Sequence, residues 1–232
     1  KRIFVHDNVF DILGPRANGY GYGIECNIGD IEIYRNWFNG GANGVVNWHE
    51  PTRYISIHHN TFYGIVHYYP TAAITFNRYD TANGGGMLDC LIQNNTHHMN
   101  NTVTSTFNGQ VHQVHFLEMN NGADINNFDL SNNVIINTSG GTVNKLINFA
   151  AVGTVVTGTN TARYNFLQGI TGGAGSLTGI TYSNNITGTA QIVGSGVKPD
   201  PYYKPVVGGN LDQTGLDIGL PFAGTAPSKG AY

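Results

Sequence analysis

Charged side chains are scarce in this sequence. Only 11% of its 232 residues are charged, and the formal net charge is −3 at pH 7, whereas roughly 25% of the residues in ordinary globular proteins carry a charge. A chain with so few basic groups lacks the electrostatic footprint of a protein that binds nucleic acid. We therefore predict no nucleic-acid partner.

Long apolar runs, helical periodicity and metal-ligand spacings are also lacking. No apolar run approaches the ~18 residues that a membrane-spanning helix needs, so we predict no membrane span, and no segment requires a helix. The two cysteines, Cys26 and Cys90, fall where side chains should point inward, which predicts buried free thiols. No spacing of Cys, His and Asp matches a zinc site, and the carboxylates are too dispersed for calcium. We predict no metal and no cofactor.

Glycine and neutral polar residues take the place of charge. The chain holds 32 glycines, and its surface must be built largely from Asn, Thr, Ser, Gly and Tyr. Such a surface suits an extracellular β-rich protein better than a cytosolic enzyme. We predict that the protein is secreted or lies on a cell surface.

One phrase recurs along the chain, and its clearest copy is Ile-Ser-Ile-His-His-Asn-Thr-Phe at residues 55–62. Its Ile residues alternate with polar residues, as in a β-strand with one buried face, and an Asn follows where the chain must turn. Similar or looser copies begin at residues 3, 31, 90, 128, 161 and 180, and their shared residue is Asn8, Asn36, Asn60, Asn95, Asn133, Asn165 and Asn185. Repeats of this length without a helical pattern indicate a solenoid, in which stacked copies bury a common core.

Each copy should also contribute a second inward-facing row. The pairs that we align in this row are Ile24 with Cys26, Val46 with Trp48, Ile74 with Phe76, Val114 with Phe116 and Ile147 with Phe149. Trp37 and Trp48 fall in register with inward aromatic residues, so we expect both in the core. The repeated Asn side chains should hydrogen-bond to one another as a ladder through the stack.

The repeated phrase resembles the coils of right-handed parallel β-helix proteins of the pectate-lyase-like superfamily, over about residues 3 to 190. The resemblance implies an all-β fold: a single-stranded right-handed parallel β-helix solenoid of about seven coils with an internal Asn ladder. Residues 215–232, with a Gly-Leu-Asp-Ile-Gly phrase and a final Gly-Ala-Tyr, resemble the last segment of secreted Bacteroidetes-type β-helix repeat proteins, although Ser228-Lys229 departs from that pattern.

Two parts are expected: a parallel β-helix at 1–197 and an irregular Pro/Gly-rich segment at 198–232 that closes the solenoid. The Pro residues after Lys198 do not suit a central strand. The other, N-terminal end of a β-helix would expose unpaired backbone groups. We therefore expect that end to be truncated, with an upstream domain or a partner chain covering it.

Residue types that can do chemistry gather on the outward face of the first three copies. One aligned column reads His6, Tyr34, His58, and the next reads Asp7, Arg35, His59. A histidine can act as a general base near neutral pH, an arginine can bind a carboxylate, and aromatic faces can hold sugars. The candidate catalytic residues are His58, His59, Arg53 and Tyr63, and the candidate substrate-binding residues are Tyr34, Arg35, His49, Glu50 and Arg78.

Two function classes remain open from the sequence. The first is an extracellular polysaccharide-binding or polysaccharide-processing domain, with a lyase-like or glycoside-hydrolase activity if it is an enzyme, and with a polysaccharide or surface glycan as its partner. For this class the resemblance implies β-elimination on an acidic polysaccharide. The second is a non-catalytic surface adhesin or structural fibre segment, in which outward His, Tyr and Arg merely tolerate a half-buried strand.

Overall fold

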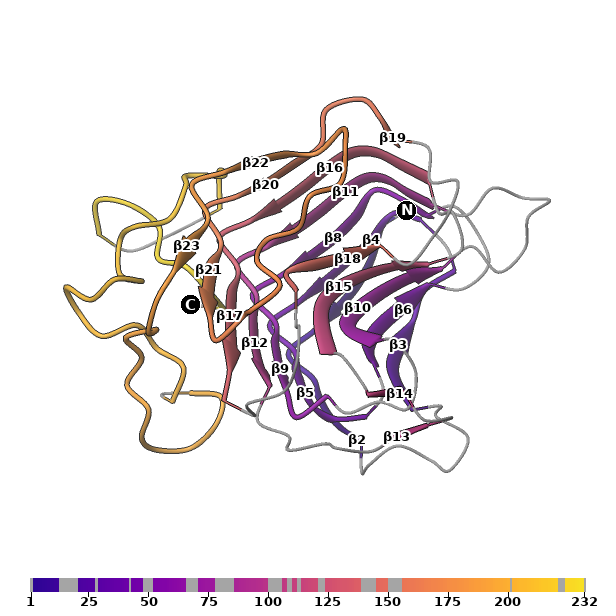
Figure 1. The fold of residues 1–232 in the computed structure, drawn as a ribbon. Helices are drawn as coiled ribbons and strands as arrows, with labels where there is room; N and C mark the ends of the chain where they lie inside the picture. Colours follow the sequence, from indigo (N-terminus) through magenta and orange to yellow (C-terminus); the bar gives the residue numbers. More distant parts are fainter. Residues whose placement is uncertain are drawn as a thin grey trace.

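The computed structural model is all-β in the part of the chain that it describes. The described residues are 2–12, 21–27, 29–41, 43–47, 52–65, 71–77, 86–99, 106–107, 110–111, 114–120, 124–138, 145–149, 156–200, 202–220 and 224–231. Within them the structure has strands and turns but no helix, and so no helix that could cross a membrane. The parallel strands of these residues form three sheets (Figure 1).

The first two sheets take their strands alternately from the repeated phrase. In spatial order, the first sheet contains β1 (Ile3–His6), β4 (Ile31–Tyr34), β8 (Ile55–His58), β11 (Gly86–Gln93), β16 (Asp124–Ser131), β20 (Thr161–Arg163) and β22 (Thr181–Ser183), with β7 (Thr52–Arg53) beside β11 and β19 (Val156–Thr157) beside β16. The second sheet contains β2 (Val9–Ile12), β5 (Trp37–Gly40), β9 (Thr61–Tyr63), β12 (Thr96–Met99), β17 (Val134–Asn137), β21 (Phe166–Gln168) and β23 (Ile186–Thr187). Each phrase therefore bends at its Asn from the first sheet into the second.

The third sheet faces the first two across the core. It contains β3 (Tyr22–Glu25), β6 (Asn43–Asn47), β10 (Thr71–Asn77), β15 (Val114–Asn120) and β18 (Ile147–Phe149). A separate antiparallel pair joins β13 (Thr106–Phe107) to β14 (Gln110–Val111). The stacked parallel sheets are consistent with a β-helix-like solenoid.

The register of the third sheet corrects the alignment expected from the sequence. Ile74 pairs with Val45 and with Leu117, so the predicted alignment of Val46 and Val114 with Ile74 is wrong. Adjacent apolar residues make either register plausible in the sequence. The core decides between them, because a shift of one residue turns every side chain to the other face.

The predicted Asn ladder is present at the corner between the first two sheets. Asn60 Nδ2 donates to Asn95 Oδ1 at 3.1 Å, to the carbonyl of Ile33 at 2.8 Å and to the carbonyl of His58 at 3.0 Å. Its Oδ1 accepts from the backbone N and from Nδ2 of Asn36. The same side-chain contact links all seven asparagines from Asn8 to Asn185.

The left-handed residue of each corner is the one before the ladder Asn, rather than the Asn itself. Its φ is 57° at Asp7, 52° at Arg35 and 54° at His59. The ladder Asn must keep its amide turned inward to reach the backbone of two strands, so the residue before it makes the bend. This conformation is unfavourable for residues with a Cβ. It also places a row of side chains along the outside of the corner.

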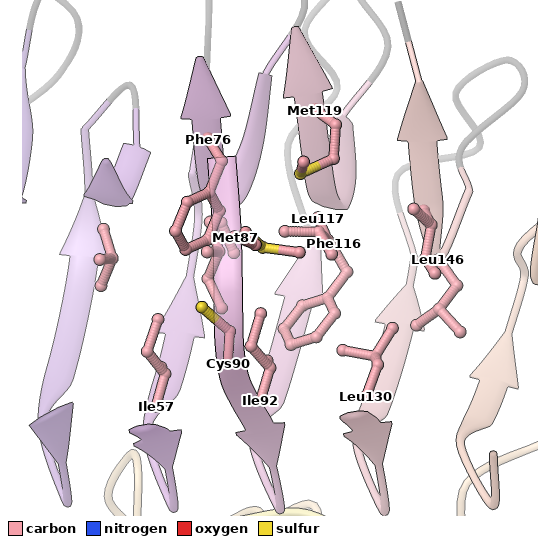
Figure 2. Close-up of a cluster of buried hydrophobic side chains, with 14 of the residues drawn as sticks. Ile57, Phe76, Met87, Cys90, Ile92, Phe116, Leu117, Met119, Leu130 and Leu146 are labelled. Carbon is pink, nitrogen blue, oxygen red and sulfur yellow. The ribbon is translucent and has the colours of Figure 1, made fainter. Parts of the chain in front are cut away.

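The core lies between the three sheets. Figure 2 shows Ile57, Cys90, Ile92 and Leu130 of the first sheet beside Phe76, Phe116, Leu117 and Met119 of the third, and all of these side chains are buried. On the second sheet, the Phe10, Phe38 and Phe62 rings stack at 4.8 Å. Stacked inward side chains of this kind bury apolar surface from one strand to the next, which is the main source of stability.

Both cysteines are free and buried, as the sequence predicts. Burial raises the pKa of the Cys26 and Cys90 thiols to about 12. Each thiol is therefore protonated at neutral pH and acts as a small apolar core side chain.

The C-terminal segment lies beside the second sheet (Figure 1, orange to yellow). It forms a smaller buried cluster in which Tyr203 and Leu211 pack against Val134, Ile136 and Phe166. Its hydrogen bonds reach the middle of the stack, since Gly230 N donates to the carbonyl of Asn132 at 2.8 Å. That this segment closes the end of a solenoid stays a prediction.

Trp37 is not part of the main core, in contrast to the expectation from the sequence. Phe38 points inward, so Trp37 faces outward, where its ring stacks on Tyr63 at 5.6 Å and packs against the cluster that holds Tyr203. Trp48, the other tryptophan expected in the core, lies outside the described residues.

Candidate functional site

The outward row at the corner begins with Asp7, Arg35 and His59. Arg35 donates to Asp7 through Nε at 2.8 Å and Nη2 at 2.6 Å, and His6 Nδ1 also lies 2.6 Å from Asp7 Oδ2. The hydrogen bonds from Arg35 and His6 hold the pKa of the Asp7 carboxyl well below its usual range. Asp7 is therefore ionised at neutral pH, and it largely balances the charge of Arg35.

A groove of about 440 Å³ runs between this corner row and the C-terminal segment. Its lining residues come from the corner, from the outward face of the second sheet and from the C-terminal segment, and they are Asp7, Asn8, Val9, Arg35, Asn36, Trp37, His59, Thr61, Pro199, Asp200 and Ala231. The groove combines an aromatic side chain, two carboxylates, a guanidinium and an imidazole.

His59 lines the groove and has a lowered pKa, which suits it to act as a proton or hydrogen-bond acceptor. Its pKa falls from 6.5 to about 4, first because the ring is buried and then because His58 and Arg35 lie nearby. A histidine with this pKa is neutral at pH 7, so it can accept a proton or a hydrogen bond there.

His59 is held by contacts with His58 and Asn94, and His58 is in turn held by Glu32. Glu32 Oε1 lies 2.9 Å from His58 Nε2, and His58 Nδ1 lies 2.9 Å from His59 Nδ1. A carboxylate can only accept, so His58 Nε2 donates to it. An amide nitrogen can only donate, so Asn94 Nδ2 donates to His59 Nε2 at 3.3 Å, and the neutral His59 ring carries its proton on Nδ1 and donates it to His58 Nδ1.

The structure brings four of the predicted site residues together. His58 and His59 are adjacent and in contact, Tyr34 stacks on His58 with ring centroids 5.2 Å apart, and the Arg35 guanidinium lies 4.9 Å from the Tyr34 ring centroid. Of these four, only Arg35 and His59 line the groove. His58 and Tyr34 support them from the face of the first sheet.

The other predicted site residues do not join this group. Arg53 lies on β7 beside Leu88, away from the corner and outside the groove lining. Tyr63 faces outward on β9, but it packs on Trp37 and beneath Lys198 Nζ, 3.9 Å from its ring centroid, and it does not line the groove. His49, Glu50 and Arg78 lie outside the described residues.

Glu32, Trp37 and Asp200 are among the groups of the site that the sequence candidates do not include. Glu32 could have been found, because it occupies the outward position opposite Ser56, two residues before His58. Trp37 is not among the candidates because the sequence alignment places it in register with the inward aromatic residues. Asp200 reaches the groove only because the C-terminal segment folds back, which no local pattern predicts.

No group of three or more His, Cys, Asp or Glu side chains that could hold a metal ion occurs among the described residues. Comparison of the whole chain with models of protein families, with curated proteins and with solved structures finds no match.

Proposed function

We propose that this chain is a polysaccharide-binding or polysaccharide-processing domain of the extracellular space or cell surface, built as a single-stranded right-handed parallel β-helix of about seven coils. One coil would consist of a strand from each of the first two sheets around a ladder Asn, followed, where present, by a strand of the third sheet. The seven linked asparagines support the number of coils. The low charge of the sequence supports the location.

The observation that carries the function is the composition of the groove. Trp37 offers an aromatic face on which a sugar ring can stack, while Asp7, Arg35, Asn8 and His59 offer hydrogen-bonding groups along one wall. Binding sites for small polar molecules combine such an aromatic surface with a few fixed polar groups. A sugar chain lying along the corner would meet a new corner side chain about every 4.8 Å.

If the groove also catalyses a reaction on its ligand, its side chains favour β-elimination on a uronic-acid residue. His59 Nε2, once it gives up the hydrogen bond from Asn94, would take the proton from the carbon beside the carboxylate, and Arg35 would stabilise the charge that develops on that carboxylate. The electrons of the broken C–H bond would form a C=C bond as the bond from the next carbon to the glycosidic oxygen breaks, and that oxygen would take a proton from water. An acidic sugar must share Arg35 with Asp7, so neutral sugars belong in the test as well.

The experiment measures binding and turnover on pectate, alginate, chondroitin and a neutral β-glucan. We expect His59→Gln to lower turnover by about 100-fold or more while binding persists, and Trp37→Leu to weaken binding. Turnover is followed by the ultraviolet absorbance of the unsaturated product. Tyr54→Ala is the control, because Tyr54 is an exposed aromatic residue outside the groove lining.

Binding to none of these polymers by the unaltered protein would refute the proposal. Binding without turnover, unchanged in His59→Gln, would limit the function to recognition.

The alternative function is a non-catalytic adhesin or fibre segment. The observation that favours it is the outward column of the first sheet beyond His58, where Gln93 and Ser131 are buried and Arg163, which follows them, is paired with Asp129. These positions offer a ligand few free groups. Binding to intact cell surfaces that survives both His59→Gln and Trp37→Leu would favour this alternative.

A further inference from the structure

We propose that the groove accepts the end of a glycan chain and not its interior, because the C-terminal segment closes the groove at one end. This inference rests on the proposed function and adds its specificity. The geometry that carries it is the path of residues 198–200, 202–220 and 224–231 over the outward face of the second sheet.

The closure is fixed by hydrogen bonds to the corner row itself. Asn132, the corner residue two copies beyond His59, donates through Nδ2 to the carbonyl of Leu216 at 2.7 Å and accepts from Leu216 N at 2.8 Å. Gly230 N donates to the carbonyl of the same Asn132 at 2.8 Å. The corner position two copies beyond His59 is therefore occupied by the protein's own backbone.

The floor of the groove is buried where the C-terminal segment crosses it. Along the outward column of the second sheet, Thr61, Thr96 and Val134 are 3%, 2% and 1% exposed, whereas Val9 and Ile186 on the two end strands are 71% and 45% exposed. Ala231 N donates to Thr96 Oγ1 at 3.0 Å, and Ala231 also lines the groove. The groove is thus shut at Ala231.

A ligand that threads through the groove would need an exit beyond Thr96, and the C-terminal segment occupies that place.

Interactions away from the groove hold this segment down. Lys198 Nζ lies 3.9 Å from the Tyr63 ring centroid and 4.8 Å from that of Tyr202, and His98 Nδ1 lies 2.8 Å from the Tyr203 hydroxyl. These contacts immediately flank Pro199 and Asp200, which form the groove wall. The wall is therefore a fixed part of the site.

The test uses the full chain and oligosaccharides of two to about eight residues from pectate, alginate and β-glucan, together with the parent polymers. We expect affinity to rise with the first few residues and then to level off, once the groove is filled up to Thr96. We also expect the amount of protein bound per gram of polymer to increase in proportion to the number of chain ends when the polymer is partly cut.

A variant probes the closed end directly. Ala231→Leu should fill it and weaken the binding of short oligosaccharides at least tenfold, which is about 1.4 kcal/mol. Ala226→Leu makes the same change in the same segment at a position outside the groove lining, and should leave binding unchanged.

Each outcome bears on a different statement. Affinity that keeps rising through eight residues, or binding in proportion to polymer mass whatever the number of ends, would overturn chain-end recognition and leave the proposed function intact. An Ala231→Leu protein that is folded and binds normally would also overturn it. Failure of every polymer and fragment to bind would refute the proposed function, and this inference with it.

Discussion

At the scale of single residues, the asparagines carry the corner of this fold. Each buried ladder Asn satisfies backbone carbonyls of two neighbouring strands and one further Asn, as Asn60 does with Ile33, His58 and Asn95. Buried backbone groups need such partners, since each unsatisfied one costs about 1–3 kcal/mol. The ladder therefore stabilises the left-handed residue that precedes each Asn.

Asn60→Ala should destabilise the protein by about 1–3 kcal/mol, because it leaves the carbonyl of Ile33 and the backbone N–H of Asn36 without their hydrogen bonds to Asn60. Denaturant unfolding measures the change. Asn8→Ala is the matched control: Asn8 is exposed at the start of the ladder, where water can replace its contacts, so it should cost less. Equal losses in the two variants would contradict this account.

His97 should make stability depend on pH. Burial lowers its pKa from 6.5 to about 3, and neither ring nitrogen has a hydrogen-bond partner in the described part of the chain. Because the pKa is lower in the folded state than in the unfolded state, the unfolded chain binds more protons. The stability that neutral His97 contributes is therefore fully present above about pH 6.5, and it is lost as the pH falls toward 3.

His97→Phe should flatten that dependence by up to about 1.4 kcal/mol per pH unit. The Phe ring would continue the stack that ends at Phe62, so the variant should fold. Urea unfolding at several pH values between 7.5 and 5 provides the measurement. A variant whose stability falls with pH as steeply as that of the unaltered protein would show that His97 is not responsible.

At the scale of elements, the close approach of the third sheet to the second depends on small residues. A Cβ added at Gly44 of β6 would lie 2.4 Å from the Phe62 ring of β9, and one added at Gly23 of β3 would lie 2.6 Å from the Phe38 ring. These glycines let the stacked rings fill the core from the opposite sheet. These positions require glycine because there is no room for a Cβ, and not because the backbone adopts an unusual φ.

Gly44→Ala should therefore cost about 1–3 kcal/mol through overpacking. Gly188→Ala is the control, because its added Cβ would lie 3.4 Å from Phe166, which is ordinary contact. The midpoints of thermal or denaturant unfolding report both changes. A Gly44→Ala protein as stable as the control would mean that the sheets can move apart freely.

At the scale of the whole molecule, neighbouring strands support one another and the ends are weaker. Each strand of the stack contacts mainly the strands before and after it, as in repeat proteins. β1 is largely exposed and β23 is exposed throughout, whereas β8 and β12 are buried at every residue. Stability should thus be highest in the middle copies.

Hydrogen exchange followed by mass spectrometry should show this gradient. We expect amides of β8, β11 and β12 to exchange slowest and those of β1, β22 and β23 to exchange fastest, since opening near the ends breaks fewer buried contacts. Uniform protection along the stack would instead indicate one indivisible cooperative unit.

The sequence by itself determined the repeated unit. The alternation of Ile residues and the recurring Asn predict parallel strands, inward rows and a hydrogen-bonded ladder, and all three are present in the structure. These features follow from local patterns, because a two-residue side-chain period and a polar corner residue act on each copy in the same way. The outward columns His6, Tyr34, His58 and Asp7, Arg35, His59 could be aligned for the same reason.

Only the tertiary structure decided what those columns face. The register of the third sheet depends on packing across the core, since Val45 and Val46 are equally apolar in the sequence. Trp37 faces outward because Phe38 takes the inward place. The groove exists because residues near 200 and 231 return to the corner of Arg35 and His59, and contacts between residues so far apart along the chain leave no periodic signal in the sequence.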